Sequence, residues 1–546
     1  MTSPPTPWPA RAVTAAAVLA ALYVAPLALR LPLLDPDEGL HAAISQEMVE
    51  RGDWVTPRFL GQPFLDKPIL FFWAQAASLR LLGSSEAAIR GVGLGFAVLG
   101  AVAVGWLGRR LLGTGAGATA CVVYATMLLP LALAQAAVHD VALVPWVVLA
   151  VAAFWEARFT ASARGTLAWS VLAGVWLGLA LLTKGLVGVA VVGLAVGAWL
   201  IWEGAVSLRL VGVGVLALAV AAVVGAPWYL AMERANPGYL RYFIVERHFL
   251  GFTTSTQIHG DRPWWYYVPL VLAGALPWIG WIGAGRETAG GAGATRSARR
   301  LSWCWLAGGW GFLSTASSKL VTYILPVFAP LALLAALDAT TAWRERPRAL
   351  ARAPRLVSAG AMALVLPALL LAGRRWFGVS GSLALAWTVA AILVAAWIAV
   401  GRARKDAGTF AWTAWLTVVT VWAALLLAIP PVARAFSARD LAAVINAHGR
   451  FPERLWVFDE RVGSLIFYLD PPIRRGLTAD RVANVGLDRI LGMRQAVPGT
   501  LVAVPLEWLE RIDRRVSLAG VPYEDAGAHR LYTTEALVAA LQRHQP

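Results

Sequence analysis

The segment LRLVGVGVLALAVAAVVGAPWY, residues 208–229, is apolar along almost its whole length. A helix needs about 20 apolar residues to cross the hydrocarbon core of a bilayer. Similar segments recur along the chain, so we predict a polytopic α-helical membrane protein with about thirteen spans. The expected spans are 11–31, 86–107, 116–135, 140–155, 168–183, 185–202, 208–229, 263–284, 301–317, 320–337, 355–373, 380–400 and 411–431.

The composition agrees with a membrane protein. Of the 546 residues, 59% are hydrophobic and 14% are charged, whereas soluble domains carry about 25% charged residues. The net charge of +16 comes with arginines in the loops between spans, as membrane insertion favours, so we expect no nucleic-acid partner. Cys121 and Cys304 lie in apolar stretches and indicate neither a disulfide nor a metal cluster. The first apolar run has no recognisable cleavage site, and we expect it to remain a span.

The basic residues of the loops predict the orientation of the chain. Cytoplasmic loops carry an excess of Lys and Arg, and a cytoplasmic N-terminus places six basic loops on that side; Arg374 and Arg375 are the exception. The loops 32–85 and 230–262 and the segments 138–140, 183–185 and 317–323 then lie on the extracytoplasmic face. The cytoplasmic groups are Arg109 and Arg110; Glu156, Arg158 and Arg164; Glu203 and Arg209; Arg286, Arg296, Arg299 and Arg300; Arg344, Arg346, Arg348, Arg352 and Arg355; Arg402, Arg404 and Lys405.

The composition changes after Pro430 and Pro431. Residues 437–546 are charged and contain short apolar runs, RLWVFDE, SLIFYLD, TLVAVP and HRLYTT, separated by helical patterns such as LEWLERID. This pattern predicts a small soluble α/β domain. We therefore divide the chain into a membrane domain, 1–436, and a soluble domain, 437–546. An odd number of spans places the soluble domain outside the cytoplasm.

Carboxylates gather in the first extracytoplasmic loop, in LLDPDEGLHAAISQEMVERGDWVTPRFLGQPFLDKPILFFW, residues 33–73. Its DEGLHAAISQEMVERG stretch predicts an amphipathic helix at the membrane interface, and a second apolar interface helix follows. Its apolar face would consist of Leu40, Ala43, Ile44 and Met48. Asp37, at the first turn, either caps this helix or serves a function. Lys67 either snorkels to the interface or holds a lipid phosphate.

Six motifs carry a resemblance to a known family. The Asp37-Glu38, Glu47-Met48, Gly52–Pro57 and Asp66-Lys67-Pro68 groups of the first loop are followed by five further motifs in order along the chain. This pattern resembles the GT-C glycosyltransferases of the family 39/83 group, which includes bacterial aminoarabinose lipid A transferases and protein O-mannosyltransferases. The five motifs are AVHDVAL, LLTKG, PWYLAMERANPGYLRYFIVERHF, HGDRPWWYYVPLVLAGALPW and SSKLVTYILPVFAPLALL.

The resemblance implies transfer of a sugar from a polyprenyl phosphate to an extracytoplasmic acceptor such as lipid A, with inversion at the sugar carbon. A carboxylate would orient the attacking oxygen or accept its proton, and cations would stabilise the departing phosphate. The implied catalytic residues are Asp37 as general base, Glu38 and Asp140. The implied substrate-binding residues are Arg58, Asp66, Lys67, His139, Lys184, Lys319 and Tyr323. Lys184 and Lys319 could instead be interfacial anchors, and Asp140 could cap a helix.

The resemblance also bears on metals, partners and location. Some relatives hold a metal between the two large loops, so His248 and His259 are candidate ligands of a structural zinc ion, although packing histidines are the alternative. The reaction requires no cofactor. The implied partners are the lipid-linked sugar, a lipid, protein or glycan acceptor, and membrane lipids. The implied location is the bacterial inner membrane, with the active site and the C-terminal domain on the periplasmic side.

Departures from the family pattern leave other functions open. Relatives that modify lipid A have Arg-Tyr where this chain has Leu40 and His41, Glu where it has Ala43, and often Arg where it has Gly251. These positions bear on the identity of the acceptor and of the sugar. One alternative is an O-mannosyltransferase-like or cell-wall glycan transferase. Another is a transporter or flippase of lipid-linked sugars, which would also need many spans and buried charges.

Overall fold

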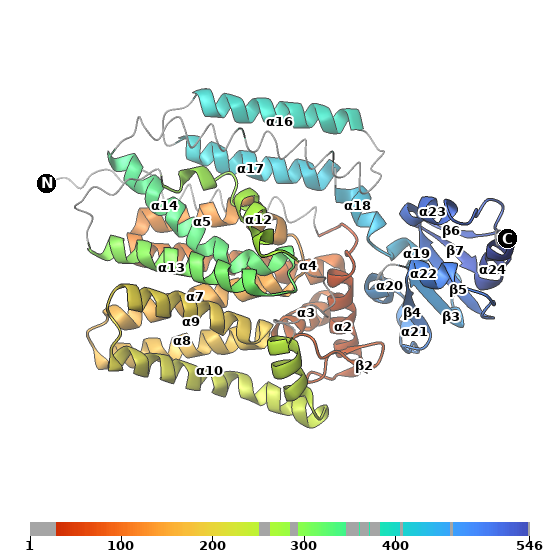
Figure 1. Cartoon of the computed structure of the whole chain (residues 1–546), viewed down its shortest axis with the longest axis horizontal. Helices are drawn as coiled ribbons and strands as arrows, with labels where there is room; N and C mark the ends of the chain where they lie inside the picture. The colour runs from red at the N-terminus through yellow and green to blue at the C-terminus, as the bar shows by residue number, and fades with distance from the viewer. Residues whose placement is uncertain are drawn as a thin grey trace.

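Figure 1 shows the computed structural model, in which long helices lie side by side and a sheet with short helices occupies the C-terminal end. The structure describes residues 29–250, 262–283, 293–345, 383–403, 408–427, 429–458 and 462–543, and the single residues 360 and 371. Five of the described helical segments are long and apolar enough to cross a membrane: Glu86–Leu112, His139–Phe159, Ala163–Lys184, Leu208–Ala235 and Val321–Thr340. Five shorter apolar helices accompany them.

The helical part consists of the following elements in chain order. They are α2 (Asp37–Arg51), the short hairpin β1 (Arg58–Phe59) and β2 (Gln62–Pro63), α3 (Leu70–Leu82), α4 (Glu86–Leu112), α5 (Thr114–Thr126), α6 (Leu128–Leu133), α7 (His139–Phe159), α8 (Ala163–Lys184), α9 (Leu186–Trp202), α10 (Leu208–Ala235), η1 (Arg241–Leu250), η2 (Trp264–Tyr266), α12 (Tyr267–Gly274), η3 (Ile279–Trp281), α13 (Gly293–Thr315), η4 (Val321–Val327), α14 (Phe328–Glu345), α16 (Leu383–Ala403), α17 (Gly408–Leu427) and α18 (Ile429–Ala435).

Several predicted spans are interrupted. The segment 116–135 breaks at Met127, whose extended backbone (φ −64°, ψ 139°) separates α5 from α6. The segment 263–284 contains η2, α12 and η3, because Pro277 supplies no backbone N–H for a continuous helix. The segment 320–337 begins with the 3₁₀ turns of η4 before α14. The spans 11–31 and 355–373 lie almost entirely outside the described residues, so the count of thirteen stays a prediction.

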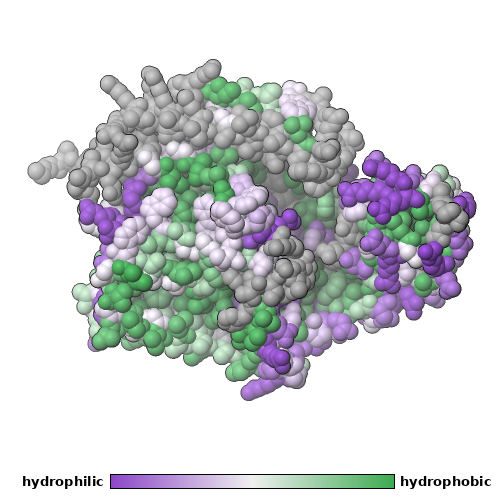
Figure 2. Space-filling view, in the orientation of Figure 1, coloured by the Kyte–Doolittle hydropathy of each residue, from purple (hydrophilic) through white to green (hydrophobic). Residues whose placement is uncertain are grey.

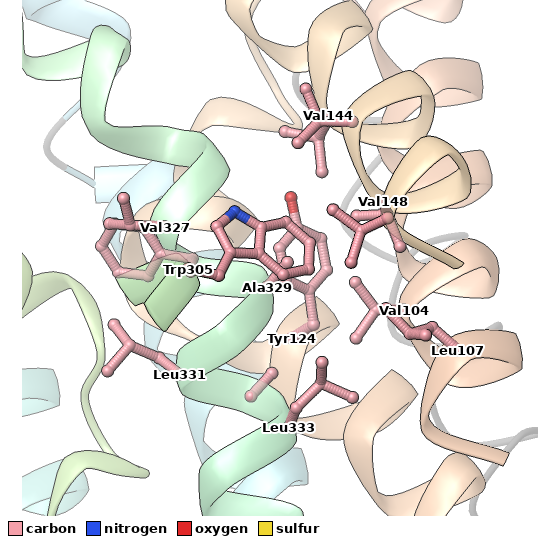
Figure 3. Packing of buried hydrophobic residues seen from close by; sticks show 14 of the residues in the cluster. Val104, Leu107, Tyr124, Val144, Val148, Trp305, Val327, Ala329, Leu331 and Leu333 are labelled. Atoms are coloured by element: carbon pink, nitrogen blue, oxygen red, sulfur yellow. The ribbon is translucent and has the colours of Figure 1, made fainter. Parts of the chain in front are cut away.

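Trp305 lies at the centre of the largest hydrophobic cluster. Its indole is fully buried, and Figure 3 shows it between side chains of the surrounding helices, including Val104, Val144 and Val148. The outward side of α10, in contrast, exposes large apolar side chains: Leu208 is 92% exposed and Val223 is 72% exposed. Soluble monomers rarely expose apolar surface of this extent. The interior therefore packs like a protein core, while the exposed apolar side of α10 is suited to contact with lipid.

The C-terminal end contains a five-stranded sheet in the order β4-β3-β5-β7-β6. Strand β3 pairs in parallel with β4 and β5, and β7 pairs antiparallel with β5 and β6. Figure 2 shows hydrophilic side chains over this part and apolar ones over the helical part. The elements are α19 (Arg439–Ala447), β3 (Arg454–Phe458), α20 (Val462–Tyr468), α21 (Pro471–Arg474), β4 (Val482–Val485), α22 (Leu487–Leu491), β5 (Thr500–Pro505), α23 (Leu506–Asp513), β6 (Glu524–Ala526), β7 (His529–Thr533) and α24 (Thr534–Arg543).

The apolar run SLIFYLD falls in helix α20, whereas RLWVFDE, TLVAVP and HRLYTT contribute strands. A short apolar run can form either a buried strand or a buried helix, and periodicity alone does not separate the two. The boundary at residue 437 and the soluble, extracytoplasmic character of 437–546 stay predictions.

Helix α2 is buried on more than one side, which differs from the interface helix with a single apolar face that the sequence predicts. Ala43, Ile44 and Met48 are buried as expected, but so are polar residues such as Ser45 and Gln46. The reason is packing from two directions, since α2 contacts both α3 and the C-terminal helix α20. Ser45 accordingly donates a hydrogen bond to Gln75 of α3, at 2.9 Å.

Candidate active site

The polar residues of the predicted site meet at one end of the helical part. Asp140 lies in the first turn of α7, and Lys184 is the last residue of α8. Because only residues 160–162 connect these packed helices, they run antiparallel, and the start of α7 lies beside the end of α8. The Lys184 ammonium forms an ion pair with the Asp140 carboxylate. It also lies 3.8 Å from the ring centroid of Tyr323 in η4, a cation–π contact.

An open cavity adjoins this ion pair, and its empty space, including the solvent at its mouth, is about 830 Å³. Three cationic side chains line it, Lys67, Lys184 and Arg247, which come from the first loop, α8 and η1. Asp66 and Tyr323 also line it. Three cations around one cavity suit an anionic ligand such as a phosphate. The remaining lining residues are Pro68, Val187, Phe243, His248, Phe312, Leu313, Ala316 and Ser318.

Lys67 is the cation of this cavity that is left for a ligand. Among the described residues, its ammonium makes no hydrogen bond or ion pair. Burial and, to a smaller extent, the positive charges of Lys184 and Arg247 together lower the pKa of Lys67 to about 8, while Asp66 and Asp140 oppose this shift. An anion bound beside the ammonium would favour its charged form.

Asp66 connects the first loop to η1. Its carboxylate pairs with the guanidinium of Arg247 at 3.2 Å and accepts a hydrogen bond from the hydroxyl of Tyr242. These contacts bring Arg247 to the cavity. Sequence reasoning missed both Arg247 and Tyr242, although they lie within the YFIVERHF part of a quoted motif.

Asp37 is the first residue of α2 and is half-buried. It does not cap the helix, because the N-cap is Pro36 and no side-chain cap is formed. Within the described part of the chain, its carboxylate has neither a hydrogen-bond nor an ion-pair partner. The cap interpretation of Asp37 is therefore not supported, and its oxygens remain available to a ligand.

His41 lies one helical turn after Asp37, and the pKa of its imidazole depends on the charges near it. Burial lowers the pKa of its imidazole to about 4; Asp37 and Asp140 act to raise it and Lys67 acts to lower it. The charges of Asp37, Asp140 and Lys67 all act on this one imidazole. Asp37, Asp140 and Lys67, from three distant stretches, thus lie in the same region.

Glu38 is structural in this arrangement, in contrast to the catalytic role that the sequence suggested. Its carboxylate accepts two hydrogen bonds from the buried guanidinium of Arg90, at 3.0 and 2.6 Å, and one each from the backbone N–H groups of Leu34 (3.0 Å) and Ala137 (2.8 Å). Burial raises the pKa of Glu38, but Arg90 and the backbone hydrogen bonds of Leu34 and Ala137 together outweigh burial, and the pKa lies below its usual value. With both oxygens occupied, Glu38 fixes the start of α2 against α4 and the segment before α7.

His139 does not line the cavity. It is 2% exposed, and its ring packs against His41 at 4.4 Å, Phe71 at 4.7 Å and Phe72 at 4.9 Å between centroids. It belongs to an aromatic cluster behind Asp140, so its predicted contact with substrate is not supported by the geometry.

Two further predicted substrate-binding residues also lie outside the cavity lining. Lys319 is 3% exposed and donates hydrogen bonds to the backbone carbonyls of Arg262, at 2.8 Å, and Ala316. Arg58 in β1 pairs with Asp53 at 3.5 Å and donates to the carbonyl of Gly61 at 3.1 Å. Lys319 thus joins its own segment to the segment at Arg262, and Arg58 stabilises the first loop.

The ring nitrogens of His248 are both occupied. Nε2 accepts from the backbone N–H of Leu186 at 3.3 Å, so Nδ1 carries the proton and donates to the carbonyl of Phe243 at 2.7 Å. No group of three or more His, Cys, Asp or Glu side chains suited to a metal occurs among the described residues. His248 as placed does not fit a zinc ligand. His259 lies outside the described residues, and the structural zinc ion stays a prediction.

Known proteins resemble this chain in sequence and in fold. Residues 66–230 match the family model described as dolichyl-phosphate-mannose-protein mannosyltransferase. The chain is 38% identical over 316 residues to an undecaprenyl phosphate-α-4-amino-4-deoxy-L-arabinose arabinosyl transferase of Erwinia tasmaniensis, covering 58% of this chain and 56% of the relative. It is 36% identical over 329 residues to the transferase of the same name from Edwardsiella ictaluri, covering 59% and 58%.

The crystal structure of ArnT from Cupriavidus metallidurans bound to undecaprenyl phosphate superposes with a TM-score of 0.74 at 23% identity, over 97% of this chain and 98% of that one. The chain has a GT-C membrane fold. Its resemblance to the aminoarabinose transferases is thereby confirmed, while in sequence the chain spans a little more than half the length of the curated relatives it matches.

In this chain, residues of the first loop, α8 and η1 come together at one end of the helical part. The family model covers Lys67, Asp140 and Lys184, the residues around the cavity, but it begins after Asp37. The position of Asp37 in the site therefore depends on the structure and on the first-loop motif.

Proposed function

We propose that this protein is an integral membrane glycosyltransferase that moves a sugar from a polyprenyl-phosphate donor to an extracytoplasmic acceptor such as lipid A, with inversion. The observation that carries the proposal is the cavity lined by Lys67, Lys184 and Arg247 in the same region as Asp37. The names of the relatives favour undecaprenyl phosphate as the lipid carrier and a pentose as the sugar.

The cations would bind the phosphate of the donor. When the bond between the anomeric carbon and the phosphate oxygen breaks, its electron pair stays on that oxygen, and the phosphate gains negative charge. Lys67 and Arg247 would stabilise this charge in a partly buried site, where electrostatic interactions are strong. Lys184, already paired with Asp140 and packed on Tyr323, would hold a fixed position for the same purpose.

Asp37 would act on the acceptor. An acceptor oxygen attacks the anomeric carbon from the side opposite the phosphate, so one displacement inverts the configuration. If the acceptor is a hydroxyl, the Asp37 carboxylate takes its proton as the new bond forms; if it is a phosphate, the carboxylate orients it. Asp140 would hold Lys184 in place. Its carboxylate would also accept hydrogen bonds from hydroxyl groups of the sugar.

We further propose thirteen spans in the bacterial inner membrane, with the cavity and residues 437–546 on the periplasmic side. Support comes from the ion pairs at the opposite ends of the helices. There, Arg110 pairs with Glu156 at 2.5 Å, and Arg158 and Arg300 pair with Glu203 at 3.2 and 3.1 Å. This basic end agrees with a cytoplasmic location, and the cavity lies at the other end.

A second candidate is a transferase that acts on proteins. The specific observation in its favour is the match of residues 66–230 to the mannosyltransferase family model. The donor side of the reaction would be the same, and the acceptor would be a hydroxyl of a peptide, for which Asp37 is a suitable base.

The test is sugar transfer by the full-length protein in lipid vesicles. Undecaprenyl-phosphate-linked pentoses and hexoses are offered with lipid A, peptide or glycan acceptors, and the products are identified by mass spectrometry. The variant is Asp37→Asn, and Glu510→Gln, which removes an exposed carboxylate on α23, is the control. We expect Asp37→Asn to lower kcat by at least about 100-fold, with binding of undecaprenyl phosphate retained.

Transfer by Asp37→Asn at the wild-type rate would contradict the assigned base. A wild-type protein that moves labelled lipid-linked sugar across the vesicle membrane, and modifies none of the acceptors, would instead be a transporter.

A further inference from the structure

Helix α20 of the C-terminal part touches α2, the helix of the candidate active site, backbone to backbone. A Cβ atom at Gly39 would lie 2.3 Å from the backbone nitrogen of Ser464, and a Cβ atom at Gly463 would lie 2.3 Å from the backbone nitrogen of Leu40. Both distances are far below a van der Waals contact, so only glycine fits at either position. The two helices are therefore closer than helices with side chains at the crossing can be.

A buried carboxylate joins the two helices beside this crossing. Asp35 is 7% exposed and accepts hydrogen bonds from the backbone N–H of Ser464, at 2.9 Å, and from the Ser464 hydroxyl. The hydroxyl oxygen in turn accepts from the backbone N–H of Ala438 at 2.8 Å, and the backbone N–H of Asp35 donates to the carbonyl of Phe436 at 2.8 Å. A fully buried serine is thus the centre of a network that ends two residues before Asp37.

Other contacts hold the remainder of α2 to the same C-terminal part. The hydroxyl of Tyr468 accepts from the backbone N–H of Leu33 at 2.8 Å and donates to Glu86 at 2.9 Å. At the far end of α2, Arg474 forms an ion pair with Glu50. The C-terminal part consequently contacts α2 before its first turn, at its crossing with α20 and near its last turn.

The first turn of α2 is held from two directions. Asp35 is bound by Ser464 of α20, and Glu38 is bound by Arg90 of α4 and by the backbone of Ala137. Asp37 lies between these two residues and has no such partner among the described residues. The carboxylates of Asp35 and Glu38 thus fix the first turn of α2. The carboxylate of Asp37 remains available for the reaction, and its direction is set by the other two.

We propose that Ser464 is a positioning residue, which acts through Asp35 to hold the Asp37 carboxylate in the geometry needed for transfer. The proposal rests on the proposed function. The C-terminal part, on this account, completes the active site mechanically and makes no contact with the donor phosphate. A misplacement of about 1 Å in a reacting group can cost about 100-fold in rate, so loss of this support lowers kcat and leaves donor binding intact.

The test compares Ser464→Ala with Ser517→Ala, a control serine of the same C-terminal part whose hydroxyl, among the described residues, bonds only Ala519 of its own turn. Initial rates of sugar transfer by the full-length protein in vesicles give kcat and KM, binding of undecaprenyl phosphate is measured directly, and thermal unfolding reports the folded fraction. We expect Ser464→Ala to lower kcat by about 10-fold or more and to leave KM and undecaprenyl-phosphate binding within about twofold. Ser517→Ala is expected to match the wild type.

Asp35→Asn extends the test to a double-mutant cycle. If Asp35 and Ser464 act as one unit, the double variant lowers kcat no more than the more severe single variant. Gly463→Ala, which pushes α20 from α2, gives an independent perturbation with the same expected split between kcat and KM.

Two results would overturn the proposal: wild-type kcat in folded Ser464→Ala and Gly463→Ala, or a decrease in kcat that only follows the folded fraction. These differ from a failure of the proposed function, in which the wild-type protein transfers no sugar or Asp37→Asn transfers it normally.

Discussion

Lys184 and Asp140 form an ion pair that joins the last residue of α8 to the first turn of α7. The pair places two largely buried charges at this end of the antiparallel helix pair. Lys67 and Arg247 reach the same place from the first loop and from η1. The structure thereby gathers an anion-binding cavity at one end of an otherwise apolar bundle.

The pKa of Lys67 predicts how donor binding depends on pH. A lysine with a pKa of about 8 loses its charge as the pH rises from 7 to 9, whereas a phosphate monoester with a second pKa near 6 stays fully ionised over this range. The affinity for undecaprenyl phosphate should therefore fall between pH 7 and 9 and be highest at the lower value. Titration of the vesicle-embedded protein with undecaprenyl phosphate at several pH values measures this affinity.

Lys67→Met serves as the comparison, since it should bind more weakly and show a flatter pH profile over the same range. A wild-type affinity that does not change from pH 7 to 9, or an equal slope in Lys67→Met, would show that another group governs the dependence.

Lys184 and Lys319 should respond differently to substitution, although both were candidates for substrate binding. Lys319→Met removes the charged donor from the backbone carbonyls of Arg262 and Ala316, and a hydrogen bond to a charged group contributes about 1.5–3 kcal/mol. We expect a lower unfolding temperature and an unchanged donor KM for the folded fraction. Lys184→Met should instead lower sugar transfer per folded molecule, because it removes a cation from the cavity. An increase in KM at unchanged stability in Lys319→Met would restore Lys319 as a substrate ligand.

Much of the site could be predicted from the sequence, for a physical reason. Asp140, Lys184 and Tyr323 are polar residues at the ends of long apolar segments, where a charge must be paired or functional. The order of the segments then places them at one end of the bundle. Asp66 and Lys67 follow from the first-loop motif, and both line the cavity.

Other features depend on contacts between distant parts of the chain and leave no local signal. The family resemblance implied a catalytic role for Glu38, but its partner Arg90 lies in an apolar segment that gives no sign of the pairing. Arg247 was overlooked beside His248. The short apolar run of α20 fits a strand as well as a helix. The contact of α20 with α2 joins distant parts of the chain, so it leaves no local signal in the sequence.

The pair of Glu38 and Arg90 predicts a large stability effect. Both side chains are 4% exposed, and removal of one partner from a buried ion pair costs about 3–5 kcal/mol. We expect Glu38→Gln to lower the free energy of unfolding by about this amount. Thermal or denaturant unfolding in detergent is the measurement.

The matched control is Glu510→Gln, whose pair with Arg514 is exposed and should contribute about 0–1 kcal/mol. A Glu38→Gln protein as stable as this control, yet inactive and able to bind undecaprenyl phosphate, would return Glu38 to the catalytic machinery.

The most direct test of the central claim is a cryo-EM structure of the full-length protein in lipid nanodiscs with undecaprenyl phosphate bound. We expect the phosphate within hydrogen-bonding distance of Lys67 and Lys184, with the Asp37 carboxylate facing the position that the anomeric carbon would occupy. A phosphate bound elsewhere on the protein, or an Asp37 carboxylate turned away from it, would show that this cavity is not the site of transfer.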